Sequence, residues 1–302
     1  MKNLIINIFK TLFFFDLAVI LITLLPEVQN KNPALQKLIE ECLPLGIVLI
    51  LTLLFILVIE RKKLKLPTER NIPKSLLWGL ITGSAIPVVF LAVTAATKHF
   101  SFISFIKTEH LIYWILGLLA NAIFAEALFR GYLFVLYKKF YGFIFATVVT
   151  TLLYLSFNFA IFSESKNYIA NIILFNVLLC FLLEYSNSII TTITARFVYT
   201  VLSGLMLGSI PLANDYPTII NHTFKPHKIL IGKDVPIEKS TFVLIVLIVL
   251  TVLFVHKKYD LIAKFKLLIK YIKQLPYAIR KLKSLPKTIK LKLKKLKRKK
   301  AR

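Results

Sequence analysis

Long apolar stretches separated by short polar connections dominate the pattern of the chain. An α-helix needs about 17 to 25 mostly apolar residues to cross the hydrocarbon core of a bilayer. Runs of this length lie near 4–25, 43–59, 75–96, 111–137, 143–162, 168–185, 188–208 and 240–256. The pattern therefore predicts an all-α fold: a polytopic membrane helix bundle with about eight transmembrane helices.

Composition agrees with this interpretation and excludes an ordinary water-soluble protein. Hydrophobic residues make up 57% of the chain and charged residues only 18%, and the mean hydropathy is +0.75. A soluble domain of this composition would expose too much apolar surface. The first run carries Lys10 and Asp16 and has no small-residue cleavage site, so we interpret it as a membrane helix and not as a cleaved signal.

Basic residues in the connections predict the orientation of the bundle. The segment from Arg61 to Lys74 holds six basic residues against one acid, and Lys138 and Lys139 follow the fourth run. Cytoplasmic connections carry such an excess of Lys and Arg. We therefore expect these connections and both termini in the cytoplasm, and the connections around 27–41, 98–109, 164–166 and 209–239 outside.

The last 46 residues form a strongly basic tail. From Lys257 to Arg302 there are nineteen basic residues and one acid, within a net charge of +26 for the whole chain. Apolar residues at helical spacing between lysines predict an amphipathic helix on a membrane surface, where each Lys or Arg near anionic headgroups contributes about 1 kcal/mol. The candidate lipid-binding residues are Lys264, Lys266, Lys270, Lys273, Lys294, Lys295 and Arg298. The alternatives are a solvated tail without a specific partner and, less favoured, a nucleic-acid-binding tail.

Ionisable residues inside the predicted spans are the candidate chemistry. Glu126 and Arg130 are four residues apart in the fourth run, a spacing that predicts an intrahelical ion pair, and Arg196 lies in the seventh run. Charged groups at membrane depth are costly and usually face a bundle interior or a cavity. Polar positions at three- and four-residue spacing in the later runs, among them Tyr154 and Asn158, predict that these helices line one cavity with the fourth.

These residues resemble the motifs of the CPBP (CAAX-protease and bacteriocin-processing, or Abi) intramembrane proteases. The family motif Glu-Glu-x-x-x-Arg corresponds to Ala125-Glu126-x-x-x-Arg130, which lacks the first glutamate. Phe-x-x-x-His corresponds to Tyr154-x-x-x-Asn158, and His-x-x-x-Asn/Asp to Arg196-x-x-x-Thr200. The resemblance spans roughly residues 75–208 and implies a CAAX-protease-like bundle. The former motif positions are therefore Ala125, Glu126, Arg130, Asn158, Arg196 and Thr200.

The substitutions argue against catalysis. In the family, the glutamates and histidines activate a water molecule, with a metal implied for some members. Asparagine cannot act as a general base at neutral pH, and arginine would repel a metal cation. None of the five histidines falls at motif depth, so we expect no zinc or other cofactor. Because Arg130 favours an ionised Glu126, it weakens that residue as a lone base, and we expect no peptidase activity.

The substituted pattern is similar to degenerate members of the family, the staphylococcal lysostaphin-resistance (surface protein display) proteins. That resemblance implies a non-catalytic multi-pass protein of a bacterial cell membrane, a scaffold or regulator of a cell-envelope enzyme such as a peptidoglycan hydrolase, or of a sensor kinase. The alternatives are an active CAAX-type intramembrane endopeptidase, a bacteriocin self-immunity protein, and a transporter or lipid-handling protein. The last has the least support because no inverted repeat is visible.

The chain divides by pattern into four segments. Residues 1–74 form a transmembrane hairpin with a basic cytoplasmic loop, 75–208 the CPBP/Abi-like core, 209–256 an outer loop with the last helix, and 257–302 the basic tail. The outer loop, 209–239, is either a contact surface for an external partner or an unconstrained connector. The two cysteines, Cys42 and Cys180, do not indicate a disulfide framework.

Overall fold

Helices form nearly all of the regular structure of the computed structural model, which describes the chain except residues 1, 62, 69–70, 211–215, 233–236 and 260–302. The helices are α1 (Lys2–Thr23), α2 (Pro33–Leu54), α3 (Ile72–Ala96), α4 (Leu111–Glu126), α5 (Phe134–Tyr141), α6 (Phe143–Phe157), α7 (Lys166–Ser186), α8 (Ile189–Thr200) and α9 (Thr241–Tyr259). Short π-helical segments at Phe55–Ile59 and Val201–Met206 extend α2 and α8, another at Ala127–Leu133 joins α4 to α5, and a 3₁₀ turn at Phe159–Ser163 follows α6. The predicted all-α membrane bundle is confirmed.

Within the described residues, six helices are long and apolar enough to cross a membrane. They are Leu4–Thr23, Pro33–Ile59, Ile72–Ala96, Leu111–Tyr141, Lys166–Ser186 and Ile189–Met206. Two further predicted spans correspond to the shorter apolar helices Phe143–Phe157 and Thr241–Lys257. The helix in the fifth predicted run is shorter than the run itself. α6 stops at Phe157, and Asn158, which follows it, has left the helical conformation and caps the helix.

Polar residues in the connections determine where several helices begin and end. The side chain of Asn32 accepts hydrogen bonds from the first turn of α2, and Asn71 does the same for α3. Such caps satisfy amide groups that have no partner within the helix. Asn187, in the left-handed conformation with φ 51°, ends α7, and Gly142 with φ 87° makes the turn between α5 and α6.

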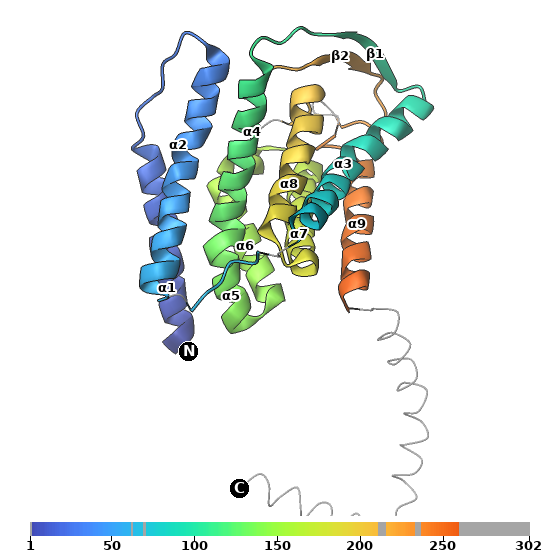
Figure 1. The fold of residues 1–302 in the computed structure, drawn as a ribbon. Helices are drawn as coiled ribbons and strands as arrows, with labels where there is room; N and C mark the ends of the chain where they lie inside the picture. Colours follow the sequence, from blue (N-terminus) through green and yellow to red (C-terminus); the bar gives the residue numbers. More distant parts are fainter. Residues whose placement is uncertain (1, 62, 69–70, 211–215, 233–236, 260–302) are drawn as a thin grey trace, which may run out of the picture. The chain divides into compact units, whose positions relative to one another are not determined.

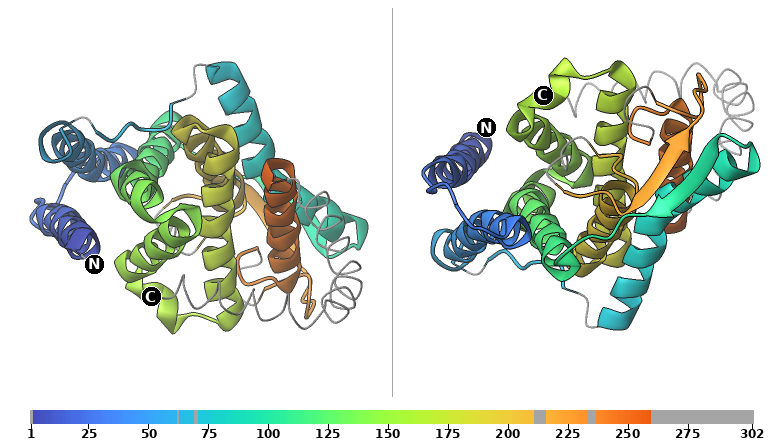
Figure 2. Two further views of the ribbon diagram at one scale, coloured as in Figure 1. Left: turned by 90° about the horizontal axis from the view of Figure 1, so that it is seen from below. Right: turned by 90° about the horizontal axis from the view of Figure 1, so that it is seen from above.

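The bundle has a central group of helices with a helix pair on each flank. Figures 1 and 2 show α1 and α2 on one flank, α3 and α9 on the other, and α4 to α8 between them. α2 packs along α4, and α3 packs along α8. The main apolar cluster joins the first two helices to the centre, where Phe14, Phe55 and Tyr132 contact one another.

Glycines allow α3 and α8 to approach closely. A Cβ atom added at Gly83 would lie 2.3 Å from the carbonyl oxygen of Ala195, and one at Gly79 would lie 2.5 Å from the Cβ of Thr194. This four-residue spacing of glycines is the small-residue pattern by which membrane helices bring their backbones together. It fixes the position of α8, which carries Arg196.

The connections alternate between two ends of the bundle. At one end, the connection after α2 contacts three helices: Glu60 pairs with Lys10 of α1, the Lys63 carbonyl oxygen accepts from Lys139 Nζ of α5, and the Pro67 carbonyl oxygen accepts from the Ile189 amide at the start of α8. At the same end, Lys138 of α5 pairs with Glu184 of α7. At the other end, β1 meets β2, and Lys239 pairs with Glu164. The first end contains the basic connections that predict a cytoplasmic side.

A two-stranded antiparallel sheet closes the second end, and the helical pattern gave no expectation of it. β1 (Phe100–Phe105) pairs with β2 (Ile220–Phe224), with an irregularity between Phe102 and Ser104. The pairing joins two connections that are more than a hundred residues apart in sequence, as the view from above in Figure 2 shows. Part of the outer loop is therefore ordered against β1, and the interpretation of this part as an unconstrained connector is wrong.

The chain separates into two compact units, residues 1–254 and 255–302. All features described below belong to the first unit. The lysines and the arginine named above as candidate lipid-binding residues, from Lys264 to Arg298, lie outside the described residues.

Candidate functional site

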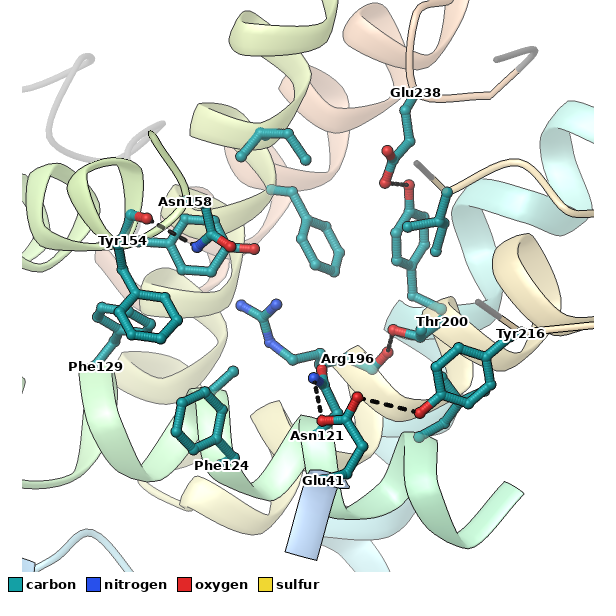
Figure 3. A pocket seen from close by; sticks show the side chains of 17 residues that line it. Glu41, Asn121, Phe124, Phe129, Tyr154, Asn158, Arg196, Thr200, Tyr216 and Glu238 are labelled. Carbon is teal, nitrogen blue, oxygen red and sulfur yellow. Dashed lines mark hydrogen bonds between the residues drawn. The ribbon is translucent and has the colours of Figure 1, made fainter. Parts of the chain in front are cut away.

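A cavity of about 190 Å³ lies among the central helices. Its walls come from α2, α4, α6, α7 and α8, from the π-helical segment after α4, and from the outer loop. Figure 3 shows side chains from these separate elements converging on it. The lining residues are Glu41, Leu118, Asn121, Phe124, Ala125, Phe129, Tyr154, Phe157, Asn158, Ile172, Phe175, Arg196, Tyr199, Thr200, Ile210, Tyr216 and Glu238.

The structure brings the three former motif regions to this one cavity. Ala125 on α4, Asn158 at the end of α6, and Arg196 and Thr200 on α8 all line it. Asn158 Nδ2 donates to the Tyr154 carbonyl oxygen at 2.9 Å, and the Thr200 hydroxyl donates to the Arg196 carbonyl oxygen at 2.8 Å. Both polar side chains are therefore partly engaged with their own backbone.

Glu126 lies beside the cavity and is fully buried. Its Oε1 accepts a hydrogen bond from Arg130 Nη1 at 2.9 Å. This contact is the intrahelical ion pair that the four-residue spacing predicts. The same oxygen accepts from Arg196 Nε at 2.8 Å, across to α8. One carboxylate thus stands between two guanidinium groups.

Asn176 on α7 completes this charged cluster. Its Oδ1 accepts from Arg130 Nη2 at 2.7 Å and from Arg196 Nη2 at 3.4 Å, and its carbonyl oxygen accepts from Arg130 Nη2 at 3.0 Å. Arg130 lies in the π-helical segment between α4 and α5; such segments are frequent at functional sites. Glu126, Arg130, Arg196 and Asn176 together link α4, α7 and α8.

The guanidinium of Arg196 projects among the aromatic residues of the cavity, as Figure 3 shows. Its central carbon lies 5.3 Å from the ring centroid of Tyr154 and 5.7 Å from that of Phe175. Both distances are within the range of a cation–π contact. A positive charge therefore lies in the cavity at Arg196, the residue that the motif resemblance aligns with the histidine of the third motif.

Glu41 introduces a second carboxylate that the motif spacing did not indicate. It comes from α2, accepts from Asn121 Nδ2 at 2.9 Å and from the Tyr216 hydroxyl at 3.3 Å, and pairs with Lys37 at 3.5 Å. No local pattern joins these residues, because they come from α2, α4 and the outer loop. Glu41 lies in the connection before the second predicted run, so the pattern of charges inside the runs did not single it out.

Glu238 brings a third carboxylate from the outer loop. It is 2% exposed, its carbonyl oxygen accepts from Asn171 Nδ2 at 2.7 Å, and its Oε1 accepts from the Tyr199 hydroxyl at 3.3 Å. Burial raises the pKa of Glu238 from its ordinary value of 4.5 to about 8, although hydrogen bonds from Tyr199 and Tyr168 act in the opposite direction. Near neutral pH this residue therefore holds its proton.

These groups do not fit a metal centre. Carboxylates and imidazoles must converge to hold a metal ion, but Asn158 and a guanidinium stand at the two motif positions that line this wall of the cavity. In the part of the chain that the structure describes, no three His, Cys, Asp or Glu side chains form a metal-binding group. Oε1 of Glu126 is already shared by two cations, and its side chain does not line the cavity.

Comparison with known proteins identifies one segment of the chain. Residues 107–202 match the family model described as type II CAAX prenyl endopeptidase Rce1-like. The matched segment runs from the connection before α4 into the π-helical extension of α8, and it contains all six former motif positions. No curated protein matches the chain.

Proposed function

We propose that residues 107–202, which match the Rce1-like family model, form a CAAX-protease-like domain of the CPBP/Abi family, and that the chain is a non-catalytic member that acts as a scaffold or regulator of a cell-envelope enzyme. The partner class is a peptidoglycan hydrolase or a sensor kinase. The protein is a multi-pass membrane protein, and the proposal places the basic end, with both termini, on the cytoplasmic side of a bacterial membrane.

The arginine in the cavity is the observation that carries this proposal. Hydrolysis of a peptide bond requires a group that takes a proton from water. The positions that supply this chemistry in the family hold Ala125, Asn158 and Arg196, and Glu126 is held in an ion pair on each side. The cluster joins three helices, so it supports a structural role better than a chemical one.

The β1–β2 sheet at the second end offers a surface that the proposed partner could contact. β1 exposes apolar side chains, with Phe102 at 51%, Ile103 at 53% and Phe105 at 71%. A two-stranded sheet has edge strands with unpaired backbone groups, which are suited to contact with another chain. In the proposed orientation this surface lies outside, where an envelope hydrolase acts.

Purification of the tagged full chain from its native membranes in several mild detergents tests the scaffold. We expect a membrane-anchored peptidoglycan hydrolase or a sensor kinase to co-purify, and to be lost from the double variant Phe102→Ser, Phe105→Ser. The matched control is Phe140→Ser, which changes an exposed phenylalanine at the other end of the bundle. Recovery of the chain alone in every detergent would contradict the proposal.

The active endopeptidase is the competing function, because Glu41 and Glu238 add carboxylates to the cavity. Incubation of the chain in proteoliposomes with a prenylated CAAX-type peptide separates the two. We expect no cleavage above that of empty liposomes. Cleavage that disappears in Glu41→Gln would establish the endopeptidase and remove the proposal.

A further inference from the structure

A second and larger cavity lies at the basic end, distinct from the one between the former motifs. Its volume is about 1020 Å³, and it is formed by the end of α2, the connection after it, α5, and the turn between α7 and α8. We call it the basic-end groove. Its lining residues are Leu53, Ile56, Leu57, Leu64, Lys65, Leu66, Pro67, Thr68, Phe134, Val135, Lys138, Lys139, Leu183 and Asn187.

One side of the groove is continuous with the surface of the bundle that faces lipid. Leu53 and Leu57 lie on the membrane-spanning helix Pro33–Ile59 and are 54% and 48% exposed. Exposed leucines on a membrane span contact acyl chains, because no water is present at that depth. An occupant of the groove can therefore enter from the bilayer, with apolar chains along this wall.

The charged side chains in the described lining of the groove are lysines. Lys65, Lys138 and Lys139 line it, and among the residues that the structure describes its lining includes no acidic residue. Lys138 donates to Glu184 at 2.5 Å, and Lys139 donates to the Lys63 carbonyl oxygen at 2.8 Å. An ammonium group has three donors, so each of these lysines keeps further donors for an anion. Thr68 and Asn187 add polar side chains beside them.

The depth of these charges matches a lipid headgroup. Lys138 and Lys139 are in the last turn of α5, at the end of the membrane-spanning stretch Leu111–Tyr141, and Lys65 is in the connection just outside the span Pro33–Ile59. Basic pockets between transmembrane helices at the cytoplasmic face bind anionic lipid headgroups. We propose that the basic-end groove binds an anionic phospholipid, with its phosphate on Lys65, Lys138 and Lys139 and its acyl chains along Leu53 and Leu57.

This site is independent of the proposed scaffold function and of the tail. It uses only side chains of the first compact unit, and no former motif position lines it. The basic tail does not complement the groove, because it carries nineteen basic residues and one acid. A membrane anion is the complementary partner that the bilayer itself supplies.

The test is lipid retention by the full chain. The protein is purified from nanodiscs that contain phosphatidylglycerol and phosphatidylcholine with identical acyl chains, and the bound lipids are counted by native mass spectrometry during titration with either lipid. We expect one tightly retained phosphatidylglycerol. The triple variant Lys65→Gln, Lys138→Gln, Lys139→Gln should bind it about a hundredfold more weakly, since the three lysines contribute roughly fivefold each, or about 1 kcal/mol each.

Two controls make the result specific. The variant Lys107→Gln, Lys225→Gln, Lys228→Gln removes the same charge from exposed lysines at the other end and should retain the lipid as the parent does. The variant Lys65→Arg, Lys138→Arg, Lys139→Arg keeps the positive charge of the groove and should also retain the lipid. This result would show that the glutamine variant loses the lipid through loss of charge and not through loss of folding. Equal retention of both lipids, equal loss in the distant variant, or displacement by soluble glycerophosphate at the concentration of the lipid would overturn the proposal.

Discussion

Glu126 and Glu238 are both buried carboxyl groups at the central cavity, but their surroundings differ. Glu126 lies between two arginines, at 2.9 and 2.8 Å, and is balanced by charge. Glu238 receives a hydrogen bond from Tyr199 at 3.3 Å, and burial raises its pKa to about 8. One acid is accommodated by an ion-pair network and the other by retention of its proton. The same residue type thus fills two different structural roles within one site.

The difference matters for what each residue can tolerate. A buried ion pair that loses one partner leaves the other charge without compensation. A protonated acid can be replaced by a neutral amide of nearly the same shape, which preserves its hydrogen-bonding groups. Glutamine is therefore a disruptive substitution at Glu126 and a mild one at Glu238.

The largest predicted effect follows directly. Glu126→Gln should lower the free energy of unfolding by about 3 to 5 kcal/mol, because Arg130 and Arg196 stay buried without their anion. Glu238→Gln should change it by less than about 1 kcal/mol at pH 7. Unfolding of both variants by heat and by SDS titration in the same detergent measures the pair. Similar losses in the two variants would show that the contrast between the acids is false.

A second substitution sharpens this result. Replacement of Arg196 by Met in the Glu126→Gln background removes one of the uncompensated cations, so part of the lost stability should return, by about 1 to 3 kcal/mol. Arg196→Met in the parent background completes the double-mutant cycle. A strictly additive loss would mean that the two side chains do not act as a unit.

The lengths of the apolar runs were sufficient to predict the helix bundle. The spacing of the intramembrane polar residues was sufficient to predict that the three motif regions meet at one cavity. Apolar runs report directly on bilayer thickness, and four-residue spacing reports on a helix face. Ala125, Asn158, Arg196 and Thr200 therefore line one cavity as their helix order indicates. The end of α6 at Asn158 was not predicted, because the apolar run continues past it to Phe162.

The rest of the site depends on contacts between distant segments, and a single sequence carries no local signal for these. Glu41 comes from the connection before the second predicted span, and Tyr216 and Glu238 come from a loop with no periodic pattern. The sheet pairs Phe100 with Phe224, a register set by tertiary structure. The close approach at Gly79 and Gly83 does have a sequence signal, the four-residue spacing of small residues in an apolar helix.

The pH dependence of stability is the next way to test the comparison. Because burial raises the pKa of Glu238 from 4.5 to about 8, the folded chain keeps a proton that the unfolded chain releases above about pH 4.5. The contribution of this retained proton to the free energy of unfolding is complete below pH 4.5 and is lost as the pH rises through 8. Between pH 6 and pH 8 the expected loss is about 2 kcal/mol.

Thermal unfolding of the parent and of Glu238→Gln across this range provides the measurement. The other groups around the carboxyl are Tyr199, Tyr168 and Glu164, and Glu164 pairs with Lys239. All of them are present in both proteins, so the difference between the two pH profiles isolates Glu238. Parallel profiles would contradict the retained proton.

The smallest predicted effect concerns the hydroxyl that donates to Glu238. Tyr199→Phe removes the hydrogen bond to Oε1, which should lower stability by about 0.5 to 1.5 kcal/mol. This hydrogen bond lowers the pKa of Glu238, so its loss should move the pH transition upward. Tyr185→Phe, at the opposite end of α7 from the Asn171 contact with Glu238, should leave the transition in place. A downward shift in Tyr199→Phe would mean that the hydroxyl serves the protonated acid and not the carboxylate. The neutral state of Glu238 would then depend on this hydrogen bond as well as on burial.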